Sequence, residues 1–119
     1  MYDINNIFAK ILRAEIPCNK IEEDLYFLSF HDINPKASIH ALVIPKGSYE
    51  NAHDFADKAT IQEIAGFWNG VNMTLAKLNL IQNGYRLITN SGLHGHQEVP
   101  HFHVHILGGQ DLGSKMVMT

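Results

Sequence analysis

The sequence has few of the features that mark secreted or membrane proteins. It contains one cysteine, Cys18, which excludes an internal disulfide and is typical of a reducing compartment. Its longest apolar runs, such as HALVIP, are far shorter than the roughly 18 residues that a membrane span requires. The N-terminal stretch MYDINNIFAKILRAEIP lacks the basic start and the cleavage site of an export signal. We therefore expect a cytoplasmic protein with no membrane partner.

The sequence also lacks any run of lysine or arginine. Its net charge is −3 and its pI is about 6.2, which argues against a groove for nucleic acid. A single phosphate can still be held by backbone amides and imidazoles, so a small anionic ligand is compatible with this composition. The length of 119 residues is enough for one hydrophobic core, and we expect a single domain over residues 1–119.

Histidine is the residue that this sequence has in excess. Eight are present, and four of them lie between positions 96 and 105. In the segment PHFHVHILGG, residues 100–109, His101, His103 and His105 alternate with apolar residues. On a strand this spacing places the three imidazoles on one face and the apolar side chains on the other.

The remaining pattern predicts an α+β fold with a mainly antiparallel sheet. Helical spacing of apolar residues predicts a short helix that Pro17 ends. Alternating segments predict a hairpin that turns at 22–24 and further strands at 39–45, 85–90 and 101–109. The stretch 47–60 is expected to be a loop with a short helical turn.

A long helix is predicted to begin after Thr60, because Thr60 and Glu63 have the spacing of a capping box. Gly66 and Gly70 weaken that helix and indicate close packing on a sheet. Its expected buried stripe consists of Ile61, Ile64, Ala65, Trp68, Val71, Leu75 and Leu78.

Three interpretations of the histidine row compete. A polar outer face would need three histidines to fall in register by chance. A metal site is limited by geometry, because His101 and His105 would stand about 13 Å apart at roughly 3.3 Å per residue, whereas a metal–nitrogen bond is about 2 Å. Two neighbouring histidines with His40 as a third ligand remain an alternative.

The catalytic interpretation uses the row in another way. A nucleophilic imidazole must be neutral, and its far nitrogen must be held as a donor so that the near one carries the lone pair. Flanking histidines can supply this order, donors to phosphate oxygens and a proton for a leaving group. His103 has an imidazole on either side and is the predicted nucleophile.

The residues 101–107, HFHVHIL, match the signature His-φ-His-φ-His-φ-φ, with φ apolar, at every position. On this motif the sequence resembles the histidine triad (HIT) family of hydrolases and transferases. The segments SFHDINPKASIHALVIPK and GYRLITNSGLHGHQEVPHFHVHILGG resemble the two halves of its Hint branch, so that the resemblance covers roughly residues 4–110.

The resemblance implies a single HIT domain with a five-stranded, mainly antiparallel sheet, one long helix and a short N-terminal helix, and a homodimer whose sheet continues across the subunits. It implies cleavage at the α-phosphate of a purine nucleotide (AMP or GMP) without a metal or other cofactor, through a nucleotidyl intermediate on the middle histidine. The catalytic residues would be His103 as nucleophile, His105 at the phosphate and leaving group, His101 partly through its backbone, and His40 orienting the nucleophile.

The same resemblance implies the substrate-binding residues. Asp32 would take the ribose hydroxyls, Phe30 and Ile33 would line the base pocket, and the phosphate region would contact Asn90, Gln97, Glu98, His103 and His105. From local sequence alone, Asp32 fits an Asx-turn before Asn34 equally well. His31, His53, His94 and His96 are not expected to be catalytic.

Two positions depart from the family pattern. Glu98 stands where some branches carry serine, and a carboxylate there would repel phosphate unless it points away. The tail QDLGSKMVMT does not match the aromatic, proline-containing tail of the animal members. The expected activity is that of a purine nucleoside phosphoramidase. The alternatives are a nucleotidyl transferase, a diadenosine-polyphosphate hydrolase, a nucleotide-binding scaffold and a metal-dependent hydrolase.

Overall fold

The structure is a computed structural model, and it describes residues 1–114 and 116. The family-atypical tail at 110–119 therefore lies partly outside the described residues. Along the chain the elements are α1 (Ile7–Leu12), β1 (Lys20–Glu23), β2 (Phe27–His31), β3 (Ile39–Pro45), α2 (Ala52–Lys58), α3 (Ile61–Lys77), β4 (Arg86–Ile88) and β5 (Val104–Gly108). None of the described helices is long and apolar enough to cross a bilayer.

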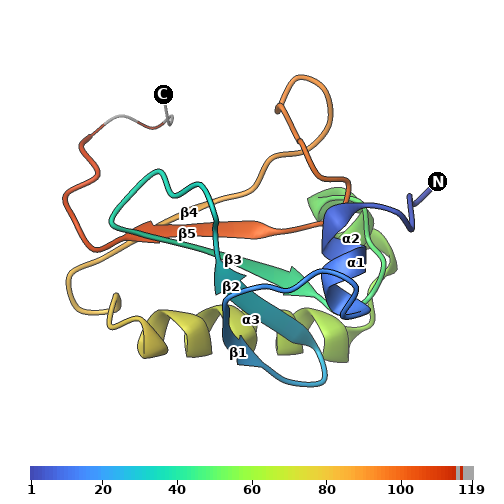
Figure 1. The fold of residues 1–119 in the computed structure, drawn as a ribbon, viewed down its shortest axis with the longest axis horizontal. Coiled ribbons are helices and arrows are strands. Elements are labelled where there is room, and N and C mark those ends of the chain that lie inside the picture. Colours follow the sequence, from blue (N-terminus) through green and yellow to red (C-terminus); the bar gives the residue numbers. More distant parts are fainter. Residues whose placement is uncertain (115, 117–119) are drawn as a thin grey trace.

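The five strands form one sheet in the order β1-β2-β3-β5-β4, and every neighbouring pair is antiparallel. The predicted antiparallel sheet and the predicted hairpin are therefore confirmed (Figure 1). The β1–β2 turn is held by Asp24, whose carboxylate accepts a hydrogen bond from the backbone N–H of Tyr26 at 2.8 Å. Because β3 lies in the centre, it brings His40 beside β5, where His40 pairs with Leu107 and Leu42 pairs with His105.

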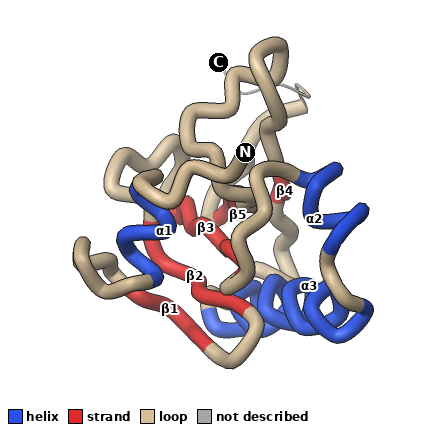
Figure 2. The backbone as a smooth tube through the Cα atoms, turned by 90° about the vertical axis from the view of Figure 1, so that its right-hand side faces the viewer, coloured by secondary structure: helices blue, strands red, loops and turns tan. Residues whose placement is uncertain are grey.

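The two faces of the sheet are covered by different helices (Figure 2). One face packs on α3 and α2 through the larger core, which includes Phe27, Val43, Phe67 and Ile106. The other face carries a smaller cluster of Phe8 from α1 with Leu28, Phe30, Leu42 and Ile44 from β2 and β3. Alternation along β3 therefore places His40 and Leu42 on the α1 face, away from the larger core.

The long helix α3 begins as predicted but is rotated from the predicted orientation. Thr60 and Glu63 form both hydrogen bonds of the capping box. The buried positions are Phe67, Gly70, Val71, Thr74 and Leu75, whereas Ile61 is 82% exposed and Trp68 is 46% exposed. Ala65 is exposed as well, so the predicted stripe was wrong at three positions, and it omitted Phe67 and the small and polar residues that face the sheet.

The glycines of α3 explain this orientation. A Cβ atom at Gly70 would lie 2.3 Å from the ring of Phe27, and one at Gly66 would lie 2.4 Å from the ring of Tyr26. Thr74, fully buried one turn further along, donates to the carbonyl of Gly70 and bonds the hydroxyl of Ser29 on β2. Close packing at both glycines, as predicted, brings α3 against β2.

Candidate active site

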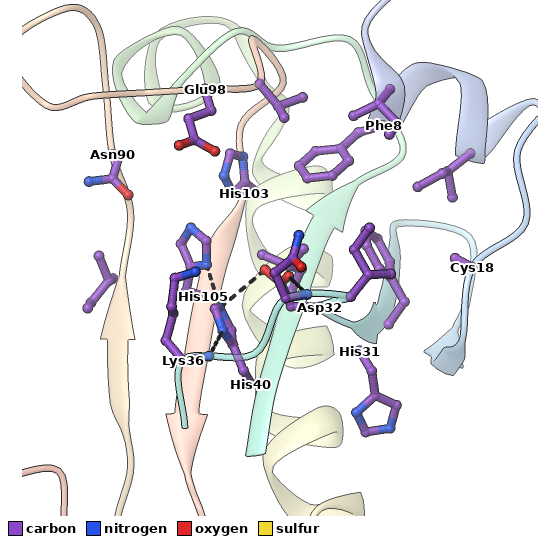
Figure 3. Close-up of a pocket in the computed structure, with 18 of the residues that line it drawn as sticks. Phe8, Cys18, His31, Asp32, Lys36, His40, Asn90, Glu98, His103 and His105 are labelled. Carbon is purple, nitrogen blue, oxygen red and sulfur yellow. Dashed lines mark hydrogen bonds and ion pairs between the residues drawn. The ribbon is translucent and has the colours of Figure 1, made fainter. Parts of the chain in front are cut away.

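A pocket of about 880 Å³ opens on the α1 face of the sheet. Its walls come from α1, from the ends of β2 and β3, from β4 and from the loop that precedes β5 (Figure 3). Of the predicted catalytic residues, His40, His103 and His105 line it, and His101 does not.

The histidine row is not one continuous strand, because β5 begins only at Val104. His101 and His103 precede the strand, and individual hydrogen bonds hold this segment. The N–H of Phe102 donates to the carbonyl of Tyr49 at 2.7 Å, and the hydroxyl of Thr89 donates to the carbonyl of His103 at 2.7 Å. The predicted strand over 101–109 was therefore too long by three residues at its start and by one at its end.

His103 is buried and its ring orientation is fixed by its own chain. Its Nδ1 lies 2.7 Å from the carbonyl oxygen of His101. A carbonyl can only accept, so Nδ1 carries the proton and Nε2 of the neutral ring carries the lone pair. Phe8 packs edge-on against the ring, with 4.9 Å between the ring centroids. His103 thus presents a bare nitrogen in the pocket, which is the form that a nucleophile requires.

His105 has the tautomer opposite to that of His103, and its contact with His40 determines this. The backbone N–H of Lys36 donates to Nδ1 of His40 at 3.0 Å, so the neutral His40 ring has its proton on Nε2. That Nε2 lies 2.9 Å from Nδ1 of His105 and donates to it. His105 must then carry its own proton on Nε2. The predicted contact from His40 to the nucleophile is corrected here, because His40 bonds His105 instead.

His101 is fully buried and has a different environment. Its Nε2 donates to the carbonyl of Pro45 at 2.9 Å, and its Nδ1 accepts a hydrogen bond from the hydroxyl of Tyr2 at 2.5 Å. Both ring nitrogens are therefore occupied. The side chain of His101 holds the backbone in place, and its carbonyl is the group that reaches another catalytic candidate.

Burial lowers the pKa of all four histidines below the ordinary value of about 6.5, because the charged form loses its hydration. The pKa of His101 falls to about 4. The pKa of His105 also falls to about 4, mainly through burial and further through the neighbouring His103 and His40. The free protein therefore has neutral imidazoles at pH 7, as the tautomers above assume.

Asp32, His40 and His105 offer ligand atoms within 4.8 Å of one another, a spacing that could hold a metal ion. The hydrogen bonding does not fit one. Coordination through Nε2 of His40 would leave the proton on Nδ1, where it would face the N–H of Lys36. The group contains His40, the third ligand considered from the sequence, but only one histidine of the row, with Asp32 in place of the second.

The apolar half of the pocket is formed mainly by Ile7, Phe8 and Ile11 of α1, together with Phe30 and Leu42 from the sheet. Phe30 is buried as predicted for a residue of the pocket wall, whereas Ile33 lies at the rim and is 87% exposed. Sequence reasoning missed the wall residues of α1. The signal was present, because their helical spacing marked an apolar face without showing that it faces this pocket.

Asp32 lies at the junction between the apolar wall and the histidines. One oxygen accepts from the backbone N–H of Asn34 at 2.8 Å, which is the Asx-turn considered from the sequence. The other oxygen lies 3.4 Å from Nε2 of His40. A carboxylate has about four lone-pair sites, so these two contacts leave it able to accept from a ligand.

The loop at 90–99 contributes the remaining predicted residues. Figure 3 shows Glu98 beside His103 and Asn90 on the side of the histidines away from Asp32. The amide of Asn90 donates to the carbonyl of Gly95 at 2.8 Å. Gln97 does not line the pocket: its amide donates to the carbonyls of Glu50 and Val99 and accepts from the N–H of Gly92. Gln97 therefore braces the loop, contrary to its predicted contact with phosphate.

Two of the four histidines not expected to be catalytic, His31 and His96, also line the pocket. Figure 3 shows the ring of His31 pointing away from the cluster, although His31 lies at the pocket rim. His53 is exposed and belongs to α2, not to a loop as predicted. His94 and His96 are exposed in the loop before β5.

The five-stranded antiparallel sheet carries an imidazole cluster over a half-apolar pocket, an arrangement that suits a small ligand. Residues 13–112 match the family model described as HIT domain. An uncharacterized 13.2 kDa HIT-like protein of Azospirillum brasilense is 49% identical over 112 residues, 94% of this chain and 92% of that protein. The chain therefore belongs to the HIT domain family.

Solved structures agree with this assignment. A HIT family hydrolase from Clostridium thermocellum superposes with a TM-score of 0.87 at 36% identity, over 95% of this chain and 97% of that one. A histidine triad nucleotide-binding protein from Candida albicans superposes with a TM-score of 0.78 at 30% identity, over 97% of this chain and 86% of that one. The protein has the fold of HIT family hydrolases and nucleotide-binding proteins.

Proposed function

We propose that this protein is a purine nucleoside phosphoramidase of the Hint branch, which hydrolyses the P–N bond between AMP or GMP and an amine. The observation that carries the proposal is the pair of opposite tautomers in one pocket. His103 presents a lone pair on Nε2, because its Nδ1 donates to the His101 carbonyl. His105 presents an N–H on Nε2, because its Nδ1 accepts from His40.

In the first step of the proposed reaction, Nε2 of His103 attacks phosphorus and the P–N bond to the amine breaks. The electron pair of that bond goes to the amine nitrogen, which takes a proton from His105. An anionic phosphate beside His105 favours its charged form and so raises the pKa of that ring in the complex. The charged ring also carries a proton on Nδ1, so the Nε2–H of His40 then donates to the carboxylate of Asp32, 3.4 Å away. Water then attacks phosphorus and gives a proton to His105, the bond between phosphorus and His103 breaks, and the nucleotide is released.

The rest of the pocket supports a nucleoside on one side of the histidines. The apolar wall formed by Phe8, Phe30 and Leu42 suits a purine base. Asp32 lies between that wall and the histidines and has lone pairs left for the two ribose hydroxyls. The amine would leave on the side of Asn90 and Glu98, opposite the base.

The proposal is tested by hydrolysis of an adenosine 5′-phosphoramidate in excess EDTA. Wild-type protein is expected to turn over without added metal, and His103→Ala is expected to lose at least about three powers of ten in kcat. The control His94→Ala changes an exposed loop residue and is expected to stay within twofold. His103→Ala should still bind AMP in calorimetry, because the base and ribose contacts remain.

An acid quench during turnover should trap a nucleotide on His103, visible as added mass on the peptide that contains it. His103→Ala within a few-fold of wild type would contradict covalent catalysis. Turnover that appears only with added zinc would favour a metal-dependent hydrolase. Nucleotide binding with no turnover at all would favour a scaffold.

We also propose that the protein forms a homodimer through the β4 edge of the sheet. β4 is an edge strand, and Leu87 on it and Ile81 before it are 37% and 55% exposed. Exposed edge strands need covering to avoid uncontrolled pairing. Sedimentation equilibrium should give twice the chain mass for wild type and for Leu25→Glu, at the β1–β2 turn, but the monomer mass for Leu87→Glu. A monomeric wild type would contradict the dimer.

A further inference from the structure

Tyr2 lies outside the pocket and is connected to the proposed nucleophile, His103, through His101. Its hydroxyl lies 2.5 Å from Nδ1 of the fully buried His101, and the two rings meet edge to face with centroids 5.7 Å apart. Neither Tyr2 nor His101 lines the pocket. Nothing in the HFHVHIL motif indicates this contact, since the two residues are 99 positions apart.

The direction of the hydrogen bond follows from the partner on the other side of the ring. The carbonyl of Pro45 lies 2.9 Å from Nε2 of His101 and can only accept. Nε2 must therefore carry the proton of the neutral ring, and Nδ1 must accept. The Tyr2 hydroxyl is the donor, and it keeps a buried nitrogen from remaining unsatisfied.

This contact matters more than an ordinary surface hydrogen bond because no β-ladder holds residues 101–103. β5 begins at Val104. Three sets of contacts fix the position of the His101 carbonyl. The N–H of Phe102, in the same peptide group, donates to Tyr49 at 2.7 Å, and the N–H of His101 donates to Val99 at 2.9 Å. The third set is the two hydrogen bonds at the His101 ring. That carbonyl in turn accepts from Nδ1 of His103 at 2.7 Å.

We propose that Tyr2 is a positioning residue for the nucleophile: its hydroxyl fixes the His101 ring, and the His101 carbonyl then fixes the tautomer and orientation of His103. This inference rests on the proposed function in naming His103 as nucleophile. Without the Tyr2 hydroxyl, His101 has a buried acceptor with no partner, and its ring and backbone can shift. His103 then no longer holds its proton on Nδ1 all the time.

The test removes one oxygen atom by Tyr2→Phe, with Tyr85→Phe as the matched control. Tyr85 is 43% exposed on the surface and lies outside the pocket. With the phosphoramidate substrate, Tyr2→Phe is expected to lower kcat about tenfold, the lower end of the range for outer contacts that orient a reactive group, and to leave KM within twofold. Tyr2→Leu, which also removes the ring, is expected to lose at least as much.

The deciding measurement is the nitrogen NMR spectrum of ¹⁵N-histidine-labelled protein at pH 7.5, which distinguishes a protonated ring nitrogen from a bare one. Wild type and Tyr85→Phe should show His103 protonated on Nδ1 and His101 protonated on Nε2. In Tyr2→Phe the His103 signals should move toward a mixture of the two tautomers. Unchanged His103 signals in Tyr2→Phe would overturn the proposal, whether or not kcat falls, because a loss of activity would then come from general destabilisation.

The spectrum also separates this inference from the proposed function. If wild-type protein does not hydrolyse the phosphoramidate, the proposed function fails, yet the His103 signals of Tyr2→Phe still show whether Tyr2 fixes that ring. If wild type turns over and the His103 signals do not change in Tyr2→Phe, only the role of Tyr2 is refuted.

Discussion

Replacing His105 by phenylalanine separates the two roles that the tautomers assign to neighbouring rings. Phenylalanine keeps the ring volume on β5 and removes both nitrogens. His40 loses its acceptor at 2.9 Å but retains the carboxylate of Asp32 at 3.4 Å, so its buried Nε2–H stays partnered. The substitution therefore removes the proposed proton donor with limited disturbance of the pocket.

The size of the effect depends on the leaving group. An amine must gain a proton as the P–N bond breaks, and general acid catalysis contributes typically about 10²- to 10⁴-fold, which corresponds to about 3 to 5 kcal/mol of activation free energy. A 4-nitrophenolate leaving group needs no proton. His105→Phe is expected to lose that full factor on an adenosine phosphoramidate but less than about tenfold on adenosine 5′-(4-nitrophenyl) phosphate.

The assay compares kcat for both substrates at pH 7.5, with His103→Ala as the reference. His103→Ala removes the nucleophile and should lose activity equally on the two substrates. If His105→Phe loses kcat equally on both substrates, the reasoning is refuted, because His105 would then stabilise the phosphate without donating a proton to the leaving group.

Two further predictions concern stability. Since the pKa of His101 is about 4 in the folded protein and about 6.5 in the unfolded chain, the unfolded state binds more protons between those values. The stability is full above pH 6.5 and should fall by about 3 kcal/mol from this group by pH 4. Urea unfolding of wild type and of His101→Asn between pH 7 and pH 4 measures this fall. An equally steep fall of stability in His101→Asn would contradict the assignment to His101. Gly70→Ala places a Cβ atom 2.3 Å from the ring of Phe27. Although alanine favours a helix, the variant should lose about 1 to 3 kcal/mol of unfolding free energy, measured by urea unfolding. The control Asn72→Ala, on the exposed face of α3, should leave that free energy nearly unchanged.

Much of the fold was predictable because its signals are local. The apolar run IHALVIP, which ends at Pro45, and the capping residues Thr60 and Glu63 mark their elements by residues that lie close together in the sequence. The orientation of α3 was not predictable in the same way. It depends on Gly70 and Thr74, which a hydrophobic pattern does not count, and on the rings of β2 that occupy the space above them.

In the candidate site, too, the sequence predicted the residues but not their tertiary contacts. The motif identified His103 and His105, and the structure places both in the pocket. The sequence could not show which atoms those rings meet. The ring of His40 meets that of His105, 65 positions along the chain, and the amide of Gln97 donates to the carbonyl of Glu50, 47 positions away. These contacts arise only when the sheet brings distant segments together.

The three histidines of the motif have the same side chain and all have a lowered pKa, so neither residue type nor pKa distinguishes a nucleophile from a proton donor among them. The partner of the second nitrogen does. The backbone carbonyl that faces Nδ1 of His103 leaves this ring with a lone pair on Nε2. The N–H that faces Nδ1 of His105 leaves that ring with a proton on Nε2. His101 stays out of the chemistry because hydrogen bonds occupy both of its nitrogens. A family member with the same three histidines but without the N–H that faces His40 would therefore lose the proton donor while keeping the nucleophile.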